Sequence, residues 1–185
     1  HLFMNAPVII GILKGKDYII ELANEGLLEV WGRTEAVIGQ PLLTALPELE
    51  AQGLISLLDR VCATGEPFYA YEFPIQLHRN GKAEVLYFDF VYKPYYDGDS
   101  RSVASGVISV GHDVTAQVMA RKAAQESQAK YRNLFKSMDQ GFCVLEMIFD
   151  DQNQPHDYRF LEANPVFTQQ TGLVDAVGKT ARELV

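Results

Sequence analysis

The dipeptide Asn80-Gly81 constrains the fold more than any other feature, because it separates two runs in which apolar and polar residues alternate. An Asn-Gly pair in this setting favours a two-residue hairpin turn of type I′. The sequence therefore predicts paired antiparallel strands over 68–79 and 82–93, in one uninterrupted register set by the turn. Pro74 has no N–H to donate, so the first strand is expected at an edge of its sheet.

This register gathers aromatic side chains on one face of the hairpin. The predicted cross-strand pairs are Arg79–Lys82, Ile75–Leu86, Phe73–Phe88, Tyr71–Phe90 and Tyr69–Tyr92. The candidates for the lining of a ligand cavity are Trp31, Tyr69, Tyr71, Phe73, Phe88, Phe90 and Tyr92. The alternative is that these side chains form an ordinary hydrophobic core. The tyrosine hydroxyls favour a polar ligand or ordered water, because a buried hydroxyl needs a partner.

The opposite face of the hairpin places Glu72 across from Asp89. Two carboxylates can act as a general acid/base pair, but like charges on a polar sheet face are usually only solvated. His112-Asp113 is predicted to close a strand, whereas the phospho-accepting histidine of a kinase lies within a long helix. We therefore identify no catalytic residues and expect Asp113 to be a turn or helix-capping residue.

The segments around the hairpin predict further strands and helices. The expected elements are strands over 8–13, 18–22 and 103–110, a short helix over 25–31 and an amphipathic helix over 49–63. Asn24 is suited to cap the short helix, and Gly65 is suited to end the longer one. Residues 114–138 contain neither glycine nor proline, which predicts one continuous helix.

Part of the sequence recurs at a single offset along the chain. Asp17-Tyr18, Ala23-Asn24 and Gly32 are repeated as Asp157-Tyr158, Ala163-Asn164 and Gly172. Each copy predicts two strands, an asparagine-capped helix and a turn that begins with glycine. The spacing between the copies far exceeds the period of solenoid repeats, so it indicates a tandem duplication of a domain.

The order of these elements resembles the PAS family. The resemblance rests on LANEGLLEVWGRTEAVIGQPL, on the long hairpin and on a last strand that closes on Gly111-His112-Asp113-Val114-Thr115. YRNLFKSMDQG and FLEANPVFTQQTGL resemble the opening of a second PAS unit. The resemblance implies an α+β fold, in which a five-stranded antiparallel sheet carries helices on one face. It implies a PAS domain over 1–113, a signalling helix over 114–138 and part of a second PAS domain over 139–185.

The resemblance also implies a sensory or interaction module of a bacterial signal-transduction protein, with a two-component sensor histidine kinase as the expected parent. The signal is expected to leave through Asp113, Val114 and Thr115 into the connecting helix, which would mediate a homodimer. Two alternatives stay open. One is a constitutive dimerisation module without a ligand, and the other is a small enzyme with an apolar pocket.

Haem and covalently bound flavin are disfavoured as cofactors. Haem-binding relatives take an axial histidine from the region before the sheet, and residues 2–77 contain none. Photosensing relatives use a cysteine in an Asn-Cys-Arg type of motif, whereas Cys62 lies in Arg-Val-Cys-Ala. Cys62 and Cys143 are far apart and lack metal-ligand spacing, so we predict buried thiols and no metal site. An unknown small ligand stays open.

The charge and hydropathy of the chain limit the kinds of partner that it can bind. The formal net charge of −8 disfavours nucleic acid, which binds clustered Lys and Arg. No apolar run approaches the ~20 residues of a membrane-spanning helix, and the amino terminus lacks the pattern of a signal peptide. We therefore expect a cytoplasmic fragment without membrane contact.

Overall fold

The computed structural model describes residues 8–98 and 104–184 of the chain. Internal contacts define two compact units, His1–Ala120 and Arg121–Val185. The predicted domain limits at residues 113 and 138 stay predictions, because the division by contacts falls inside a helix.

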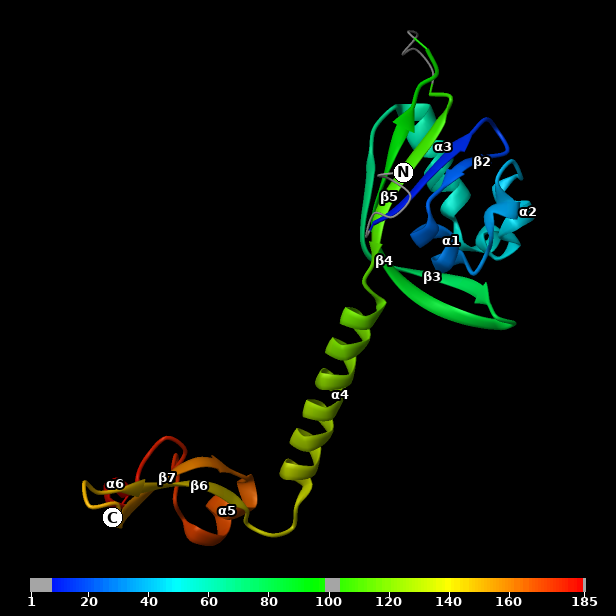
Figure 1. Cartoon of the computed structure of the whole chain (residues 1–185). Helices are drawn as coiled ribbons and strands as arrows, with labels where there is room; N and C mark the ends of the chain where they lie inside the picture. Colours follow the sequence, from blue (N-terminus) through cyan, green and yellow to red (C-terminus); the bar gives the residue numbers. More distant parts are fainter. Residues whose placement is uncertain (1–7, 99–103, 185) are drawn as a thin grey trace. The chain divides into compact units, whose positions relative to one another are not determined.

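The first unit contains a sheet of five strands in the order β2-β1-β5-β4-β3 (Figure 1). The strands are β1 (Ile9–Lys14), β2 (Ile19–Ala23), β3 (Phe68–Arg79), β4 (Lys82–Tyr95) and β5 (Gly106–Asp113). All neighbouring strands are antiparallel. β3 lies at one edge of the sheet, which confirms the position predicted from Pro74.

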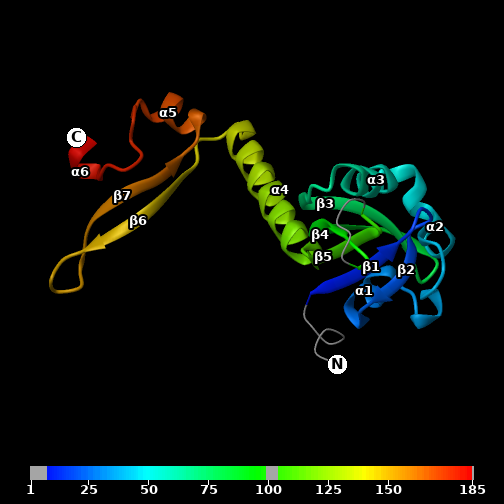
Figure 2. The ribbon, with the colours of Figure 1, turned by 90° about the horizontal axis from the view of Figure 1, so that it is seen from above.

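Helical segments between β2 and β3 pack on one face of this sheet (Figure 2). They are α1 (Glu25–Trp31), the 3-10 helix η1 (Glu35–Val37), α2 (Leu42–Ala45), the 3-10 helix η2 (Pro47–Gln52) and α3 (Leu54–Thr64). Helices and strands enclose one core, in which Ile20, Leu46 and Leu58 are almost completely buried. The predicted α+β fold, a five-stranded antiparallel sheet with helices on one face, is confirmed.

The helix predicted over 49–63 is interrupted. Gly53 has a φ of 74°, a left-handed conformation that ends η2 and lets α3 begin at Leu54. Gly65 ends α3 as predicted, and its N–H donates to the Val61 carbonyl at 2.9 Å. The last strand of the sheet also begins later than predicted, at Gly106; residues 101–103 lie outside the described residues.

The predicted hairpin register is confirmed between Phe73–Phe88 and Arg79–Lys82. It is wrong for the beginning of β3, where the pairs are Phe68–Tyr92, Tyr69–Val91 and Ala70–Phe90. A β-bulge between Ala70 and Phe73 inserts the extra residue, so the residues before it change faces. Tyr69 and Tyr71 are consequently 58% and 78% exposed, and Ala70 is buried instead.

A side chain of the neighbouring strand supports this bulge. Glu72 has a φ of 48°, which costs about 1 kcal/mol for a residue with a Cβ atom. Its backbone N–H donates to the Asp89 carboxylate at 2.7 Å. A hydrogen bond to a charged acceptor offsets such a cost. Glu72 and Asp89 are thus joined through the Glu72 backbone and are not a cross-strand pair.

α4 (Thr115–Ser137) follows β5 as one continuous helix, and its ends agree with the prediction to within one residue. Val118 is the buried residue of its described side chains. Within the part of the chain that the structure describes, no helix has both the length and the apolar composition needed to cross a membrane.

The second unit repeats the beginning of the first. β6 (Cys143–Phe149) and β7 (Pro155–Ala163) form an antiparallel pair, followed by α5 (Pro165–Thr171) and α6 (Ala181–Leu184). Asn164 caps α5, as Asn24 caps α1, and a left-handed glycine ends each of these helices. The partial second unit is therefore confirmed. From Phe142 onward, its exposed large apolar side chains are Phe142, Leu145, Met147, Phe149, Tyr158, Leu161, Val174 and Val177.

Candidate ligand cavity and signal exit

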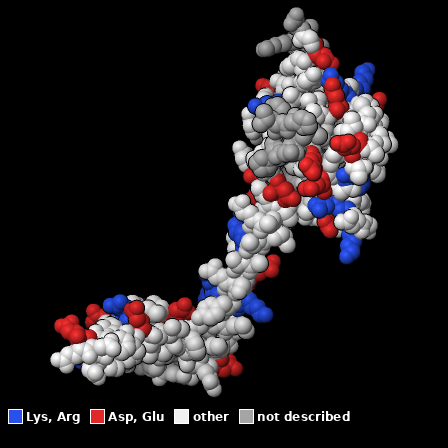
Figure 3. Space-filling model, viewed as in Figure 1, with Lys and Arg blue, Asp and Glu red and all other residues white. Residues whose placement is uncertain are grey.

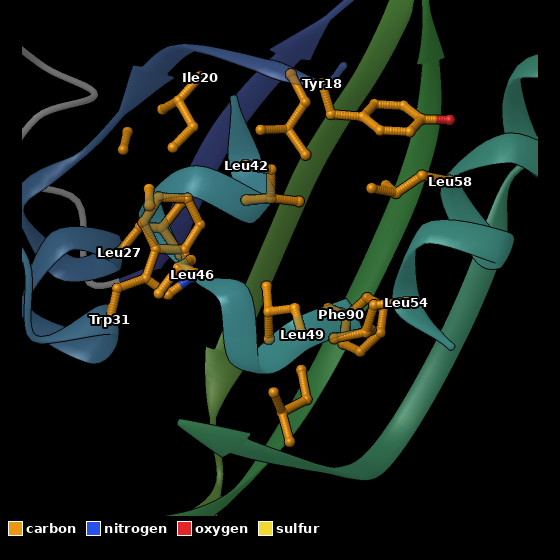
Figure 4. Packing of buried hydrophobic residues seen from close by; sticks show 14 of the residues in the cluster. Tyr18, Ile20, Leu27, Trp31, Leu42, Leu46, Leu49, Leu54, Leu58 and Phe90 are labelled. Carbon is orange, nitrogen blue, oxygen red and sulfur yellow. The ribbon is translucent and has the colours of Figure 1, made fainter. Parts of the chain in front are cut away.

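A cavity lies in the first unit between the sheet and the helices that cover it. Its lining comes from β1, α1, α2, η2, α3, β3, β4 and β5: Ile9, Gly11, Leu13, Leu27, Val30, Trp31, Leu42, Leu49, Leu54, Ile75, Leu77, Phe88, Phe90, Tyr92 and Ser109. The side chains of Trp31, Leu49 and Phe90 can be located in Figure 4. The cavity is small, with a volume of about 60 Å³, and its lining is mainly apolar.

Four of the seven candidate residues line this cavity, namely Trp31, Phe88, Phe90 and Tyr92. Phe73 packs edge-on against Phe90, with ring centroids 5.6 Å apart, and belongs to the surrounding core. Tyr69 and Tyr71 do not contribute, because the bulge turns them away from the core.

Sequence reasoning missed the aliphatic part of the lining. Leu27, Leu42, Leu49 and Leu54 come from four separate helical segments. Helical periodicity marks such residues as buried, but it does not indicate which of them leave space between them. Ser109 was missed as well, because its neighbours in β5, Ile108 and Val110, are apolar.

Three polar side chains contribute to the lining: Trp31, Tyr92 and Ser109. Tyr92 and Ser109 are directly paired across β4 and β5. Within the described residues, no hydrogen bond satisfies the indole N–H or either hydroxyl. Burial raises the pKa of the Tyr92 hydroxyl, so this group stays protonated and can donate. The lining contains no charged side chain.

Two hydrogen-bonding side chains of η2 hold this segment against the edge of β3. The Gln52 side chain accepts from the Gln76 N–H and donates to the Gln76 carbonyl, both at 2.8 Å. Glu48 accepts from the backbone N–H of His78 at 2.9 Å. Since Leu49 and Leu77 line the cavity, these bonds fix one of its walls.

The Glu48 carboxylate is nearly enclosed, with 4% of its side chain exposed. Arg33 Nη2 lies 3.6 Å from Oε1, and His78 Nδ1 lies 3.8 Å from Oε2. Arg33 also donates to the carbonyl oxygens of Ala45 and His78, both at 3.0 Å. The guanidinium therefore joins the segment after α1 to α2 and β3, and it supplies the charge that a buried carboxylate needs.

Tyr18 lies at the other end of the core. Its hydroxyl donates to Asp59 at 2.5 Å, and burial together with this hydrogen bond raises its pKa. Burial also raises the pKa of the nearby Cys62 thiol. Cys62 and Cys143 are both half-buried. A thiol with a raised pKa is a poor nucleophile, in accordance with the predicted role of Cys62 in the core.

The predicted signal exit lies where β5 meets α4. The Asp113 carboxylate accepts from the Thr115 N–H at 2.8 Å, as expected of a turn or capping residue. The Tyr87 N–H donates to Thr115 Oγ1 at 2.8 Å, and the Tyr87 carbonyl accepts from the Val114 N–H at 2.8 Å. One residue of β4 thus fixes the beginning of α4 through both of its backbone groups.

Within the described ranges 8–98 and 104–184, no cluster of three His, Cys, Asp or Glu side chains could hold a metal ion. On the face drawn in Figure 3, Lys and Arg are dispersed among acidic side chains. This distribution agrees with a net charge of −8 and offers no continuous basic surface on that face.

Family models match both units of the chain. A model described as the PAS fold matches residues 3–119, and a model described as a PAS domain matches residues 129–185. The chain belongs to the PAS family. Its two PAS matches are separated by residues 120–128, which lie within α4, so a helix connects the tandem units.

Solved PAS structures are similar to the chain. A PAS domain from Colwellia psychrerythraea is 17% identical, with a TM-score of 0.48 over 62% of this chain and 92% of that one. The PAS domain of the histidine kinase ThkA is 23% identical, with a TM-score of 0.44 over 57% and 98%. An RNA-binding light-oxygen-voltage receptor is 19% identical, with a TM-score of 0.51 over 68% and 35%. This last likeness shows the fold alone.

Proposed function

We propose that the chain is a sensory PAS module that converts a change in its cavity into a change at the beginning of α4. The observation that most strongly supports this proposal is that the Tyr87 backbone hydrogen-bonds to both Val114 and Thr115. Tyr87 lies in β4 between Leu86 and Phe88, and Phe88 is part of the cavity wall. A displacement of Phe88 therefore reaches the first turn of α4 through one residue of backbone.

The burial of Val118 also connects the first turn of α4 to the first unit. Val118 is only 1% exposed, and its N–H donates to the Val114 carbonyl at 3.0 Å. Val118 is thus the side chain that holds the first turn of α4 in the first unit, so this turn follows the strand that anchors it. Two packing states of the sheet and helices would give two positions of this turn, and a ligand that prefers one state would shift their populations.

The proposal includes a parallel homodimer formed along α4. Four large apolar side chains of the helix and its carboxyl end are 42–56% exposed: Met119, Tyr131, Leu134 and Met138. Tyr131, Leu134 and Met138 have the spacing of one helical face. Light scattering at tens of micromolar should give the mass of a dimer, and a monomeric mass would contradict this part of the proposal.

The wider context is also part of the proposal. Tandem PAS units joined by a helix favour a bacterial two-component sensor histidine kinase in the cytoplasm, with the catalytic machinery outside this chain. Haem and covalently bound flavin stay disfavoured on the sequence grounds given above, so we expect the purified protein to be colourless. A stoichiometric absorption band in the haem or flavin region would contradict this expectation. The alternative is a constitutive dimerisation module, in which the cavity and α4 are energetically independent.

A double-mutant cycle distinguishes these two functions. Phe88→Leu changes the cavity wall, and Thr115→Val removes the hydroxyl that accepts from Tyr87. Hydrogen exchange of the Val118 amide measures the opening free energy of the first turn. If the chain is a sensor, the effects of Phe88→Leu and Thr115→Val on this opening free energy should be non-additive by at least about 0.5 kcal/mol. Additive effects would favour the constitutive module.

The matched control combines Thr115→Val with Phe149→Leu. Phe149 is an exposed phenylalanine of the second unit, so the same chemical change is made away from the cavity. The control pair should be additive. Thr115→Ser keeps the hydroxyl and should leave the Val118 exchange close to that of the unmodified protein.

A further inference from the structure

We infer that the cavity selects a compact, neutral and mainly apolar ligand that carries a hydrogen-bond acceptor. This inference deepens the proposed function, since it names the class of molecule that the sensory module would bind. It rests on the size of the cavity, on the charge of its lining and on the three polar groups of Trp31, Tyr92 and Ser109.

The size of the cavity limits the ligand. An apolar cavity of roughly 150 Å³ holds a benzene molecule. The available 60 Å³ is less than half of that volume, so the ligand must be compact. A single five- or six-membered ring enters only when the walls move outward, which is the kind of displacement that the proposed sensory function requires.

The lining determines the charge of the ligand. None of the lining side chains is acidic or basic. The buried Glu48 carboxylate forms an ion pair with Arg33 at 3.6 Å, and neither residue lines the cavity. A charged ligand would lose its hydration without gaining an opposite charge, which is strongly unfavourable. The wall therefore discriminates against carboxylates, phosphates and amines.

The polar groups determine the chemistry of the ligand's one polar atom. The indole N–H of Trp31 can only donate, and the raised pKa of Tyr92 keeps its hydroxyl a donor. Tyr92 and Ser109 are paired across adjacent strands and line the same cavity, so either hydroxyl can donate to a ligand there. A carbonyl oxygen or a ring nitrogen satisfies donors that have no partner within the described residues.

The test uses pyridine and benzene, two rings of equal size of which only pyridine carries an acceptor. At pH 7.5 pyridine is neutral. Each is titrated into the full chain while the indole N–H resonance is followed by NMR. Trp31 is the single tryptophan of the sequence, so this resonance is assigned without ambiguity. Both rings should shift this resonance with saturation, and pyridine should bind more tightly than benzene.

Hydroxyl deletions identify the groups that recognise the acceptor. At least one of Tyr92→Phe and Ser109→Ala should weaken pyridine binding about threefold or more, whereas benzene binding changes less than twofold in both variants. Tyr69→Phe is the matched control, because Tyr69 is an exposed tyrosine of the adjacent strand that does not line the cavity. The control should leave both affinities unchanged.

Several outcomes would overturn the inference. They are failure of both rings to bind, equal losses for pyridine and benzene in the hydroxyl deletions, or saturable binding of acetate at the indole resonance. Saturable pyridine binding together with additivity between Phe88 and Thr115 would retain the ligand class and refute the proposed transmission. Non-additivity between Phe88 and Thr115 without binding of either ring would support the proposed transmission and refute the ligand class.

Discussion

Asn24 and Asn164 make the same three side-chain hydrogen bonds at equivalent places in the two units. Each amide oxygen accepts from the first turn of the following helix and from the preceding strand segment, at Leu27 and Ile10 in the first unit. Each amide nitrogen donates to a backbone carbonyl before that strand. Both side chains are completely buried. One asparagine thus joins strand and helix in each copy, which explains why the repeat is centred on it.

Asn24→Ala should destabilise the first unit by about 3 kcal/mol. The substitution removes a helix cap and leaves backbone groups of Ile10 and Val8 without their partner. Urea unfolding monitored by Trp31 fluorescence measures the loss, since Trp31 lies in the same unit. Asn133→Ala is the control, because Asn133 is exposed on α4 and its replacement should cost less than about 0.5 kcal/mol. Equal effects of the two substitutions would refute this role of Asn24.

The sequence predicts the elements that depend on local signals. Asn24, Gly65 and the Asn80-Gly81 turn act within a few residues, so their consequences can be read directly. The register of β3 fails beyond Phe73 because a turn fixes only the pairs that follow it without interruption. The bulge depends on Asp89, which is distant in sequence from the residue it supports. No alternation pattern in β3 alone reveals that hydrogen bond.

The candidate cavity was predicted only in part for a related reason. Alternation identifies Phe88, Phe90 and Tyr92 as one face of a strand, and they do line the cavity. The remaining walls come from separate helical segments, whose positions depend on tertiary packing. The ties between η2 and β3 are made by Gln52 and Glu48, and helical periodicity does not indicate to which strand such polar side chains bond.

Asp89→Ala should destabilise the sheet more than Asp89→Asn does. Alanine leaves the Glu72 N–H without its acceptor, at a cost of about 1–3 kcal/mol, whereas the asparagine carbonyl can still accept. Urea unfolding gives the two free energies. Loss of the acceptor should also speed exchange of the Glu72 amide. If that amide exchanges equally fast in both variants, the bulge is held by something other than Asp89.

Glu48→Ala should be about 1–3 kcal/mol less stable than Glu48→Gln. Both substitutions leave Arg33 in a partly buried position without an anion, but alanine also removes the acceptor of the His78 N–H. Glutamine keeps a neutral acceptor for the His78 backbone. Thermal unfolding of both variants provides the comparison. The exposed neighbour Glu50 is the control, and Glu50→Ala should unfold close to the unmodified protein.

Stability should fall as the pH rises above about 10, the pKa of tyrosine in an unfolded chain. Burial raises the pKa of Tyr18 and Tyr92, so the folded protein keeps protons that the unfolded chain releases. The folded state then binds more protons, and its stability falls with increasing pH. Below about pH 10 both states are protonated at these residues, and their contribution to stability is complete.

Tyr92→Phe should reduce this alkaline loss, which urea unfolding at pH 9 and at about pH 11 measures. Tyr18→Phe should reduce it as well, although this variant also loses the hydrogen bond to Asp59 at every pH. Tyr69→Phe changes an exposed tyrosine and should leave the loss unaltered. Identical pH dependence in all three variants would assign the loss to other groups.

The second unit should be protected in solution by pairing with another copy. β6 has one strand partner among the described residues, whereas its counterpart β1 pairs with both β2 and β5. An isolated two-stranded sheet is marginally stable, and exposed apolar strands tend to pair with another chain. Leu145, Met147 and Phe149 supply such a surface along β6. We therefore expect slow hydrogen exchange at residues 144–149 that becomes faster on dilution.

Met147→Lys tests the contact directly, because a charge at the centre of β6 opposes apolar pairing. The variant should exchange faster at residues 144–149 and lose the dependence on concentration. Val174→Lys introduces the same charge at an exposed valine outside the strands and should preserve the protection. Exchange at 144–149 as fast as in an unfolded peptide, already in the unmodified protein, would show that this pairing does not form.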